Sequence, residues 1–159
     1  MLRALFPRRG LVVEKVSGPD AFGHISAVVT KYHRHHEATV GWMWGLMAWN
    51  NGDLVGVGVV GHATARLLMQ RGILEVTRVC TFSRKRYGAA SAIYKAASSH
   101  AGASPIITYT LASEAGVSLA AAEWHDEGIA GGGKWNRGCV TPDHLAGKKR
   151  RWCDRLRQK

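Results

Sequence analysis

The sequence has few cysteines and lacks the features of secreted or membrane-spanning chains. Its cysteines, Cys80, Cys139 and Cys153, are odd in number and widely spaced, which predicts neither a disulfide framework nor a CxxC zinc site. There is no run of about 18 apolar residues, so no membrane-spanning helix is expected. The opening MLRALFPRRG has too short an apolar stretch for a secretory signal. Together these absences favour a protein of the reducing cytoplasm with no membrane partner.

Acidic residues are also scarce, with 11 Asp and Glu against 22 Lys and Arg, which gives a net charge of +11. A balance this basic favours a polyanion such as nucleic acid or an anionic membrane; a basic protein whose charge serves only solubility is the alternative. Near the C-terminus cations alternate with aromatic residues, a mixture that suits phosphate neutralisation and base stacking. We therefore predict nucleic-acid contacts at Arg34, Lys134, Trp135, Arg137, Lys148, Lys149, Arg150 and Arg151.

The chain has no internal repeat and no long low-complexity linker, so a single domain over residues 1–159 is expected. Its last part, from about residue 131 to residue 159, is polar and basic and is predicted to be a tail. Truncation after Ala146 should then spare the core. The alternative is that Trp152 and Leu156 anchor this segment to the fold.

Local patterns predict a mixed α/β fold. Val40–Trp49 and Leu54–Val60 are apolar segments joined by Asn50-Asn51-Gly52-Asp53, a sequence typical of an antiparallel hairpin turn. Trp42, Trp44, Leu46 and Ala48 alternate and should share one strand face. A hairpin followed by alternating strands and helices predicts a central twisted mixed sheet of about five to seven strands with flanking helices. The other expected elements are strands at 11–16, 73–81 and 105–111, helices at 21–33, 89–100 and 117–124, and a short helix or irregular crossing at 63–70.

The segment from Leu74 to Ala97 contains a candidate phosphate site. A hydrophobic strand, LEVTRVC, leads into a basic loop, SRKRYG, and then into a helix of small residues, AASAIYKAA. Free N–H groups at a helix start attract anions, and the helix dipole adds to this attraction. Gly88 leaves room for close approach, so the pattern suits a pyrophosphate. An ordinary strand–loop–helix with a solvated basic loop is the alternative.

This segment resembles the acyl-CoA site of GNAT acyltransferases. Lys85-Arg86-Tyr87-Gly88-Ala89-Ala90 is similar to their loop Q/R-x-x-G-x-G/A, with Lys in the first place, and the element order is similar from about Leu11 to Gly128. The resemblance implies a GNAT-like fold and an acyltransferase that uses acetyl-CoA or a related acyl-CoA. It also implies that the pantetheine chain lies between two splayed strands. The implied cofactor contacts are Val79, Cys80, Thr81, Lys85, Arg86, Tyr87, Gly88, Ala89, Ala90 and Ser91.

Four shorter pieces, HRHH, LEVTR, TLASE and AAEW, resemble the Mom-type phage DNA-modification proteins and a related group of uncharacterised phage and prophage proteins. This narrower resemblance implies transfer of an acyl-type group to the adenine amine of DNA, in the cytoplasm of a bacterial host. A base inside a duplex is unreachable, so the enzyme would flip it or use single strands. The alternatives are a GNAT enzyme acting on a small amine or on protein, and a nucleic-acid-binding module without catalysis. The oligomeric state, homodimer included, is left open.

Candidate catalytic residues come from three places. His33 and His36 lie in a dense polar cluster and titrate near neutrality, which suits a general base. The alternatives there are a metal site, which lacks a second ligand cluster, and a solvated helix end; no metal is predicted. Glu75 and Arg78 are three positions apart in a strand, so they should face opposite sides. The resemblance favours Arg78 for the cleft, and a salt bridge to a covering helix is the alternative. Ser113 follows the next strand at the carboxyl edge, where open α/β sheets bind ligands.

One position departs from the GNAT pattern. Many GNAT enzymes carry a Tyr four residues before a Gly-aromatic pair in the last helix, and this Tyr protonates the leaving thiolate. Here Glu123-Trp124 takes the place of the pair, and Leu119 takes the place of the Tyr. Another acid must then act, or the thiolate leaves unaided. Tyr87, Tyr109 and Ser118 are the nearby candidates.

Overall fold

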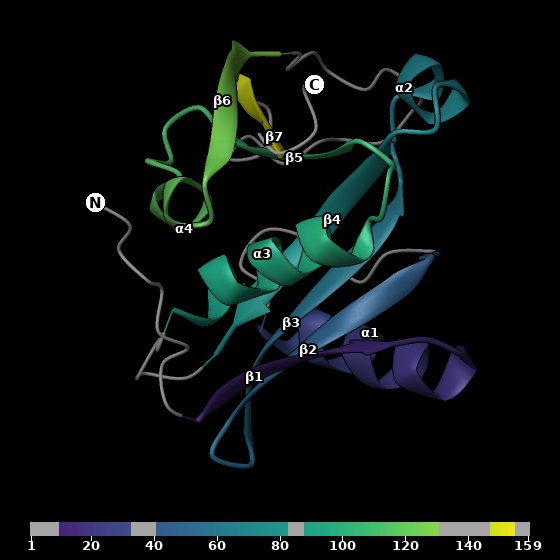
Figure 1. The fold of residues 1–159 in the computed structure, drawn as a ribbon, viewed down its shortest axis with the longest axis vertical. Helices are drawn as coiled ribbons and strands as arrows, with labels where there is room; N and C mark the ends of the chain where they lie inside the picture. Colours follow the sequence, from purple (N-terminus) through teal and green to yellow (C-terminus); the bar gives the residue numbers. More distant parts are fainter. Residues whose placement is uncertain (1–9, 33–40, 83–87, 131–146, 155–159) are drawn as a thin grey trace.

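The computed structural model describes residues 10–32, 41–82, 88–130 and 147–154 of the chain (Figure 1). Strands and helices alternate along most of this length. In chain order the elements are β1 (Leu11–Val16), α1 (Pro19–Tyr32), β2 (Trp44–Asn50), β3 (Asp53–His62), α2 (Arg66–Gln70), β4 (Leu74–Thr81), α3 (Ala89–His100), β5 (Ile106–Leu111), α4 (Val117–Ala121), β6 (Trp124–Ile129) and β7 (Lys149–Asp154).

The seven strands form one sheet in the order β1-β2-β3-β4-β5-β7-β6. Only β4 and β5 run parallel, and every other neighbouring pair is antiparallel. The predicted mixed sheet with flanking helices is therefore confirmed. None of the helices in the described part of the chain is long and apolar enough to cross a membrane.

The hairpin of β2 and β3 turns at Asn51 and Gly52, as the sequence predicts. Both residues have positive φ, 51° and 89°, the backbone conformation that Asn and Gly adopt in two-residue hairpin turns. Leu46 and Ala48 share a buried face, as expected. Trp42 lies before the strand instead of within it, and its ring packs on Phe22 of α1 with ring centroids 5.2 Å apart.

Two hydrophobic clusters lie on opposite faces of the sheet. One contains Leu46 and Val76 together with Ile93 of α3. The other contains Met47 together with Ile25 of α1. Helix α3 approaches its face closely, because a Cβ on Gly58 would lie 2.6 Å from the Ile93 side chain. The sheet is thus covered by α3 on one side and by α1 on the other.

The C-terminal third differs from the sequence prediction. The expected helix 117–124 ends at Ala121, and Trp124 begins strand β6. Lys149–Asp154 is strand β7, inserted between β5 and β6. The prediction that a truncation after Ala146 would spare the core is therefore wrong, since it would remove a central strand. The alternative that Trp152 anchors this segment fits the structure, because that side chain is buried, whereas Leu156 lies outside the described residues.

Candidate active site

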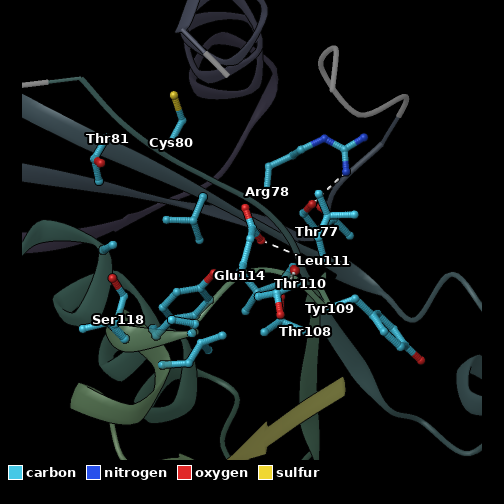
Figure 2. Close-up of a pocket in the computed structure, with 18 of the residues that line it drawn as sticks. Thr77, Arg78, Cys80, Thr81, Thr108, Tyr109, Thr110, Leu111, Glu114 and Ser118 are labelled. Atoms are coloured by element: carbon cyan, nitrogen blue, oxygen red, sulfur yellow. Dashed lines mark hydrogen bonds between the residues drawn. The ribbon is translucent and has the colours of Figure 1, made fainter. Parts of the chain in front are cut away.

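The parallel strands β4 and β5 separate soon after they begin. They pair only at Leu74–Ile106 and Glu75–Ile107. On its other edge, β5 pairs with β7 from Ile107 to Leu111. The Thr108 hydroxyl donates to the Val76 carbonyl oxygen at 2.8 Å, so a side chain bridges the strands where the ladder stops. A cavity of about 680 Å³ lies here (Figure 2). Its lining comes from Tyr32, Val76–Thr81, Gly88, Ala90, Tyr94, Thr108–Leu111, Glu114–Leu119 and Lys149.

A β-bulge interrupts β4 beside this cavity. Val60 of β3 pairs with Val76, but the preceding Val59 pairs with Arg78, so Thr77 has no opposite residue in that ladder. Val76 and Val79 consequently both contact the core cluster beneath α3, although they are three positions apart. The extra residue changes the alternation of the strand. The prediction that Glu75 and Arg78 face opposite sides is therefore wrong, and the two share the face opposite α3.

Arg78 reaches the cavity wall at the bulge. One of its guanidinium nitrogens donates to the Thr77 carbonyl oxygen at 2.7 Å (Figure 2). Burial lowers the pKa of the Arg78 guanidinium below its ordinary value, and the nearby Glu75 carboxylate partly opposes this shift. Glu75 is itself buried and accepts a hydrogen bond from the Thr64 N–H at 2.7 Å. A cation is thus held against the β4 backbone where the two strands diverge.

The start of α3 lies at the same cavity. Gly88 is the residue before the helix, with φ 72° and no side chain to cap the first turn. Ser91 turns its hydroxyl back to the Gly88 carbonyl oxygen at 2.9 Å. Small residues and free N–H groups at a helix start form an anion-binding end.

The predicted cofactor residues divide between the cavity, the core and the part of the chain that is not described. Val79, Cys80, Thr81, Gly88 and Ala90 line the cavity, whereas Ala89 is buried in the core. Ser91, in the first turn of α3, is not part of the lining. Lys85, Arg86 and Tyr87 lie outside the described residues.

Of the predicted catalytic residues, Arg78 lines the cavity and Ser113 does not. Ser113 is exposed in the turn after β5, while its neighbour Glu114 lies on the cavity wall and accepts from the Leu111 N–H at 3.2 Å. His33 and His36 fall outside the described residues. Within the described ranges, no group of three or more His, Cys, Asp or Glu residues could hold a metal ion.

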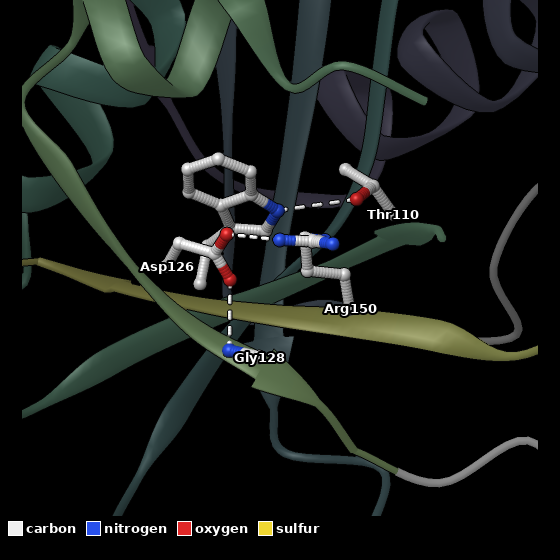
Figure 3. A network of polar contacts seen from close by, with 5 residues as sticks. Thr110, Asp126, Gly128 and Arg150 are labelled. Atoms are coloured by element: carbon white, nitrogen blue, oxygen red, sulfur yellow. Dashed lines mark hydrogen bonds and ion pairs between the residues drawn. The ribbon is translucent and has the colours of Figure 1, made fainter. Parts of the chain in front are cut away.

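The predicted nucleic-acid residues fall into three groups: those that are exposed or line the cavity, those held in ion pairs, and those outside the described residues. Lys149 lines the cavity, and Lys148 is exposed. Arg150 forms an ion pair with Asp126 of β6 (Figure 3). Arg151 forms one with Glu127 of the same strand, so both guanidinium groups already have carboxylate partners. Arg34, Lys134, Trp135 and Arg137 lie outside the described residues.

The Asp126 carboxylate has a second partner besides Arg150. The Gly128 N–H donates to it at 2.8 Å. This hydrogen bond, helped by Arg150, lowers the pKa of Asp126 below its ordinary value. Strands β6 and β7 are therefore held together by ion pairs between their side chains as well as by backbone hydrogen bonds.

Leu119 is fully buried in the core cluster and offers no proton. Glu123 has φ 65°, a left-handed conformation that usually favours glycine. This fits the sequence comparison, in which Glu123 takes the position of the glycine in the GNAT pattern.

Sequence analysis missed Tyr94 of α3, which lines the cavity. Its ring packs edge-on against Trp124, with centroids 5.4 Å apart. Burial raises the pKa of Tyr94 to about 12; a hydrogen bond with Thr108 partly opposes the shift, and the Glu114 charge adds to it. Thr108 and Glu114 come from other parts of the chain, so no local pattern around Tyr94 indicates this environment.

The arrangement is that of GNAT acetyltransferases of known structure. A Corynebacterium glutamicum protein, histone acetyltransferase HPA2 and related acetyltransferase, shares 14% identity with a TM-score of 0.61 over 91% of this chain and 96% of its own. A GNAT-family acetyltransferase of Streptococcus pneumoniae shares 13% identity with a TM-score of 0.59 over 91% and 98%. A Bacillus subtilis acetyltransferase solved in complex with CoA shares 14% with a TM-score of 0.55 over 91% and 97%. No protein-family model and no curated protein sequence matches the chain. At these identities the likeness defines the fold: this chain has the GNAT acetyltransferase fold.

Proposed function

We propose that this chain is an acyltransferase that takes its acyl group from acetyl-CoA or a related acyl-CoA and transfers it to an amine. The main structural support for this proposal is the divergence of β4 and β5 beside the start of α3. A bound acyl-CoA would supply an activated thioester carbonyl. The Bacillus subtilis structure, solved with CoA, supports the same use of this fold.

The residues present fit such a cofactor. Gly88 and the first turn of α3 offer backbone N–H groups to a pyrophosphate, and helix N-termini bind such anions without side chains. Beyond Glu75, the edge of β4 that faces β5 has no strand partner among the described residues, so its N–H and C=O groups can hold the amide groups of a pantetheine arm. Arg78, fixed to the Thr77 carbonyl oxygen, would orient the bulge at the reacting end.

A glycine pair tests the cofactor site. Gly88→Val should weaken acetyl-CoA binding at least about tenfold, because a side chain would crowd the phosphate and strain a left-handed backbone; tenfold is about 1.4 kcal/mol. Gly102→Val is the control, since Gly102 follows α3 with φ 62° and open space around it. Both variants carry similar backbone strain, and only the first should lose calorimetric affinity. Equal affinity in the two variants would contradict the placement.

For the acceptor, we propose a nucleic-acid base, as in the Mom-type proteins that the sequence resembles. Supporting this are the net charge of +11 and the cations Arg78 and Lys149 on the cavity wall. Tyr32, another lining residue, is 44% exposed and stacks on Phe82 with centroids 4.8 Å apart. Stacked aromatic rings beside cations suit a splayed base.

Acceptor identity can be measured directly. Radiolabelled acetyl-CoA is incubated with single-stranded DNA, duplex DNA, spermidine or a lysine-containing peptide, and label transfer is counted. We expect single-stranded DNA to be labelled fastest, with a modified nucleoside found by mass spectrometry after digestion. Labelling of spermidine or the peptide alone would move the acceptor to a small amine or protein. Binding of DNA without acetyl-CoA binding would leave a nucleic-acid-binding module.

A further inference from the structure

Acyl transfer needs a proton donor that this chain does not have at the usual position. If the proposed acyltransferase function holds, breaking the thioester leaves charge on sulfur, and a positioned acid speeds such a step. Leu119 occupies the position of the GNAT tyrosine and is enclosed by the core. The described cavity wall offers other hydroxyl groups that can act as the donor.

We infer that Tyr94 of α3 is this donor. Its side chain lines the cavity and forms a hydrogen bond with Thr108. Thr108 in turn donates to Val76, one residue beyond the last β4–β5 pair. The Tyr94 hydroxyl is therefore located at the closed end of the divergence. A thioester whose phosphates rest on Gly88 would bring its sulfur toward this end.

The position of Tyr94 is fixed by its own helix and by its neighbours. Its link to Thr108 keeps the hydroxyl at the closed end of the divergence. Trp124 holds one edge of its ring, and the ring packs against the core cluster. A ring held on these sides keeps its hydroxyl in one place, which a proton donor requires.

The chemistry of the cavity suits a phenol. A hydroxyl with a pKa of about 12 is protonated at every physiological pH, so the donor form is always present.

The step balances without any further reactant. Tyr94 gives its hydroxyl proton to sulfur as the carbon–sulfur bond breaks and the carbon–nitrogen bond forms. The electron pair of the broken bond stays on sulfur, which becomes a neutral thiol. The acceptor amine loses one proton to water, and water returns one proton to the Tyr94 phenolate.

Three other hydroxyls of the described cavity wall are less suitable. Tyr109 lies toward Arg151 across the strand pair, and Figure 2 shows its side chain directed away from Glu114 and Ser118. Ser118 carries an aliphatic hydroxyl, a far weaker acid than a phenol. Thr108 likewise carries an aliphatic hydroxyl.

The test is Tyr94→Phe, compared with Ser98→Ala. Ser98 lies on the same helix outside the cavity lining, and its hydroxyl donates to the Tyr94 carbonyl oxygen, so its removal controls for the loss of one buried hydroxyl. For each variant we measure acetyl-CoA affinity by calorimetry and kcat by thiol release with the fastest acceptor of the labelling assay. Where no acceptor is labelled, water serves as the acceptor. Tyr94→Phe should lower kcat about 100-fold, in the range of a general acid, and leave the acetyl-CoA Kd within about threefold. Ser98→Ala should leave kcat within about threefold.

The outcomes separate the two proposals. If the wild type binds and turns over acetyl-CoA while Tyr94→Phe keeps kcat within about threefold, Tyr94 is not the donor and the acyltransferase stands. A Tyr94→Phe variant that loses affinity and kcat together would make Tyr94 a binding residue, which also overturns the inference. If the wild type neither binds nor turns over acetyl-CoA, the proposed function fails and the donor role fails with it.

Discussion

The strands β1–β4 and the group β5, β7 and β6 form two parts of one sheet, and they are assembled differently. In the first part, strands that follow one another in sequence lie side by side. In the second part, β7 comes last in the described chain yet lies between β5 and β6. The first part is held mainly by apolar side chains such as Leu46 and Val57. The second adds two charged pairs across β6 and β7, of which Figure 3 shows Asp126 with Arg150. Strand β7 is therefore internal to the sheet although its sequence begins like a polar surface segment.

The largest expected effect comes from removing β7. A chain that ends at Ala146 loses the partner of both β5 and β6 and the buried Trp152. These losses are large against the usual stability of a domain, about 5–15 kcal/mol, so the cooperative thermal transition should disappear. A chain that ends at Asp154 keeps β7 whole and is the control, monitored by circular dichroism. A sharp transition in the shorter chain would mean that β1–β4 fold independently of β7.

A smaller effect should follow when one buried side chain in each part of the sheet is truncated to alanine. Trp152→Ala should cost about 3–5 kcal/mol and Leu46→Ala about 2–5 kcal/mol of unfolding free energy, since both side chains are buried in the same cluster. Urea denaturation should give a single transition with an unchanged slope in both variants. A two-step curve for Trp152→Ala alone would show that the two parts unfold separately.

The smallest expected effect comes from the Asp126–Arg150 ion pair between β6 and β7. The pKa of Asp126 is lowered in the folded protein, first by the Gly128 N–H and then by Arg150. A carboxylate with a lowered pKa stabilises the fold above its unfolded pKa, about 3.9, and this stabilisation disappears as pH falls through the folded value. Asp126→Asn should therefore melt below wild type at pH 7, and the gap should close below about pH 4. Asp53→Asn, in the hairpin turn of the first part, removes the same charge as a control. A gap that stays constant down to pH 2 would contradict the assignment.

The sequence predicts the first part of the fold well because its signals are local. The Asn51-Gly52 turn, the helix from Ala89 to His100 and the apolar strand β4 each depend on neighbouring residues. Strand β7 could not be predicted in this way. Its run Lys149-Arg150-Arg151 becomes compatible with a central strand only because Asp126 and Glu127 of β6 neutralise it.

The candidate site was predictable to a similar degree. The helix start at Gly88 follows from the local motif, and the position of Arg78 on the cavity was implied by the resemblance to GNAT enzymes. The shared face of Glu75 and Arg78 does not, because it depends on a bulge opposite Val59 and Val60. Tyr94 was missed because its neighbours Thr108 and Glu114 are brought to it only by the tertiary fold.

The position of β7 also has a consequence for how the protein is made. During translation, β5 and β6 are complete before Asp154 has been added, and they do not pair with each other. Until β7 emerges from the ribosome, both have exposed edges, a state that favours pairing with other chains. The wall of the cavity that carries Thr108 and Thr110 is therefore supported late in synthesis, and slow translation before residue 149 should make the nascent chain prone to aggregation.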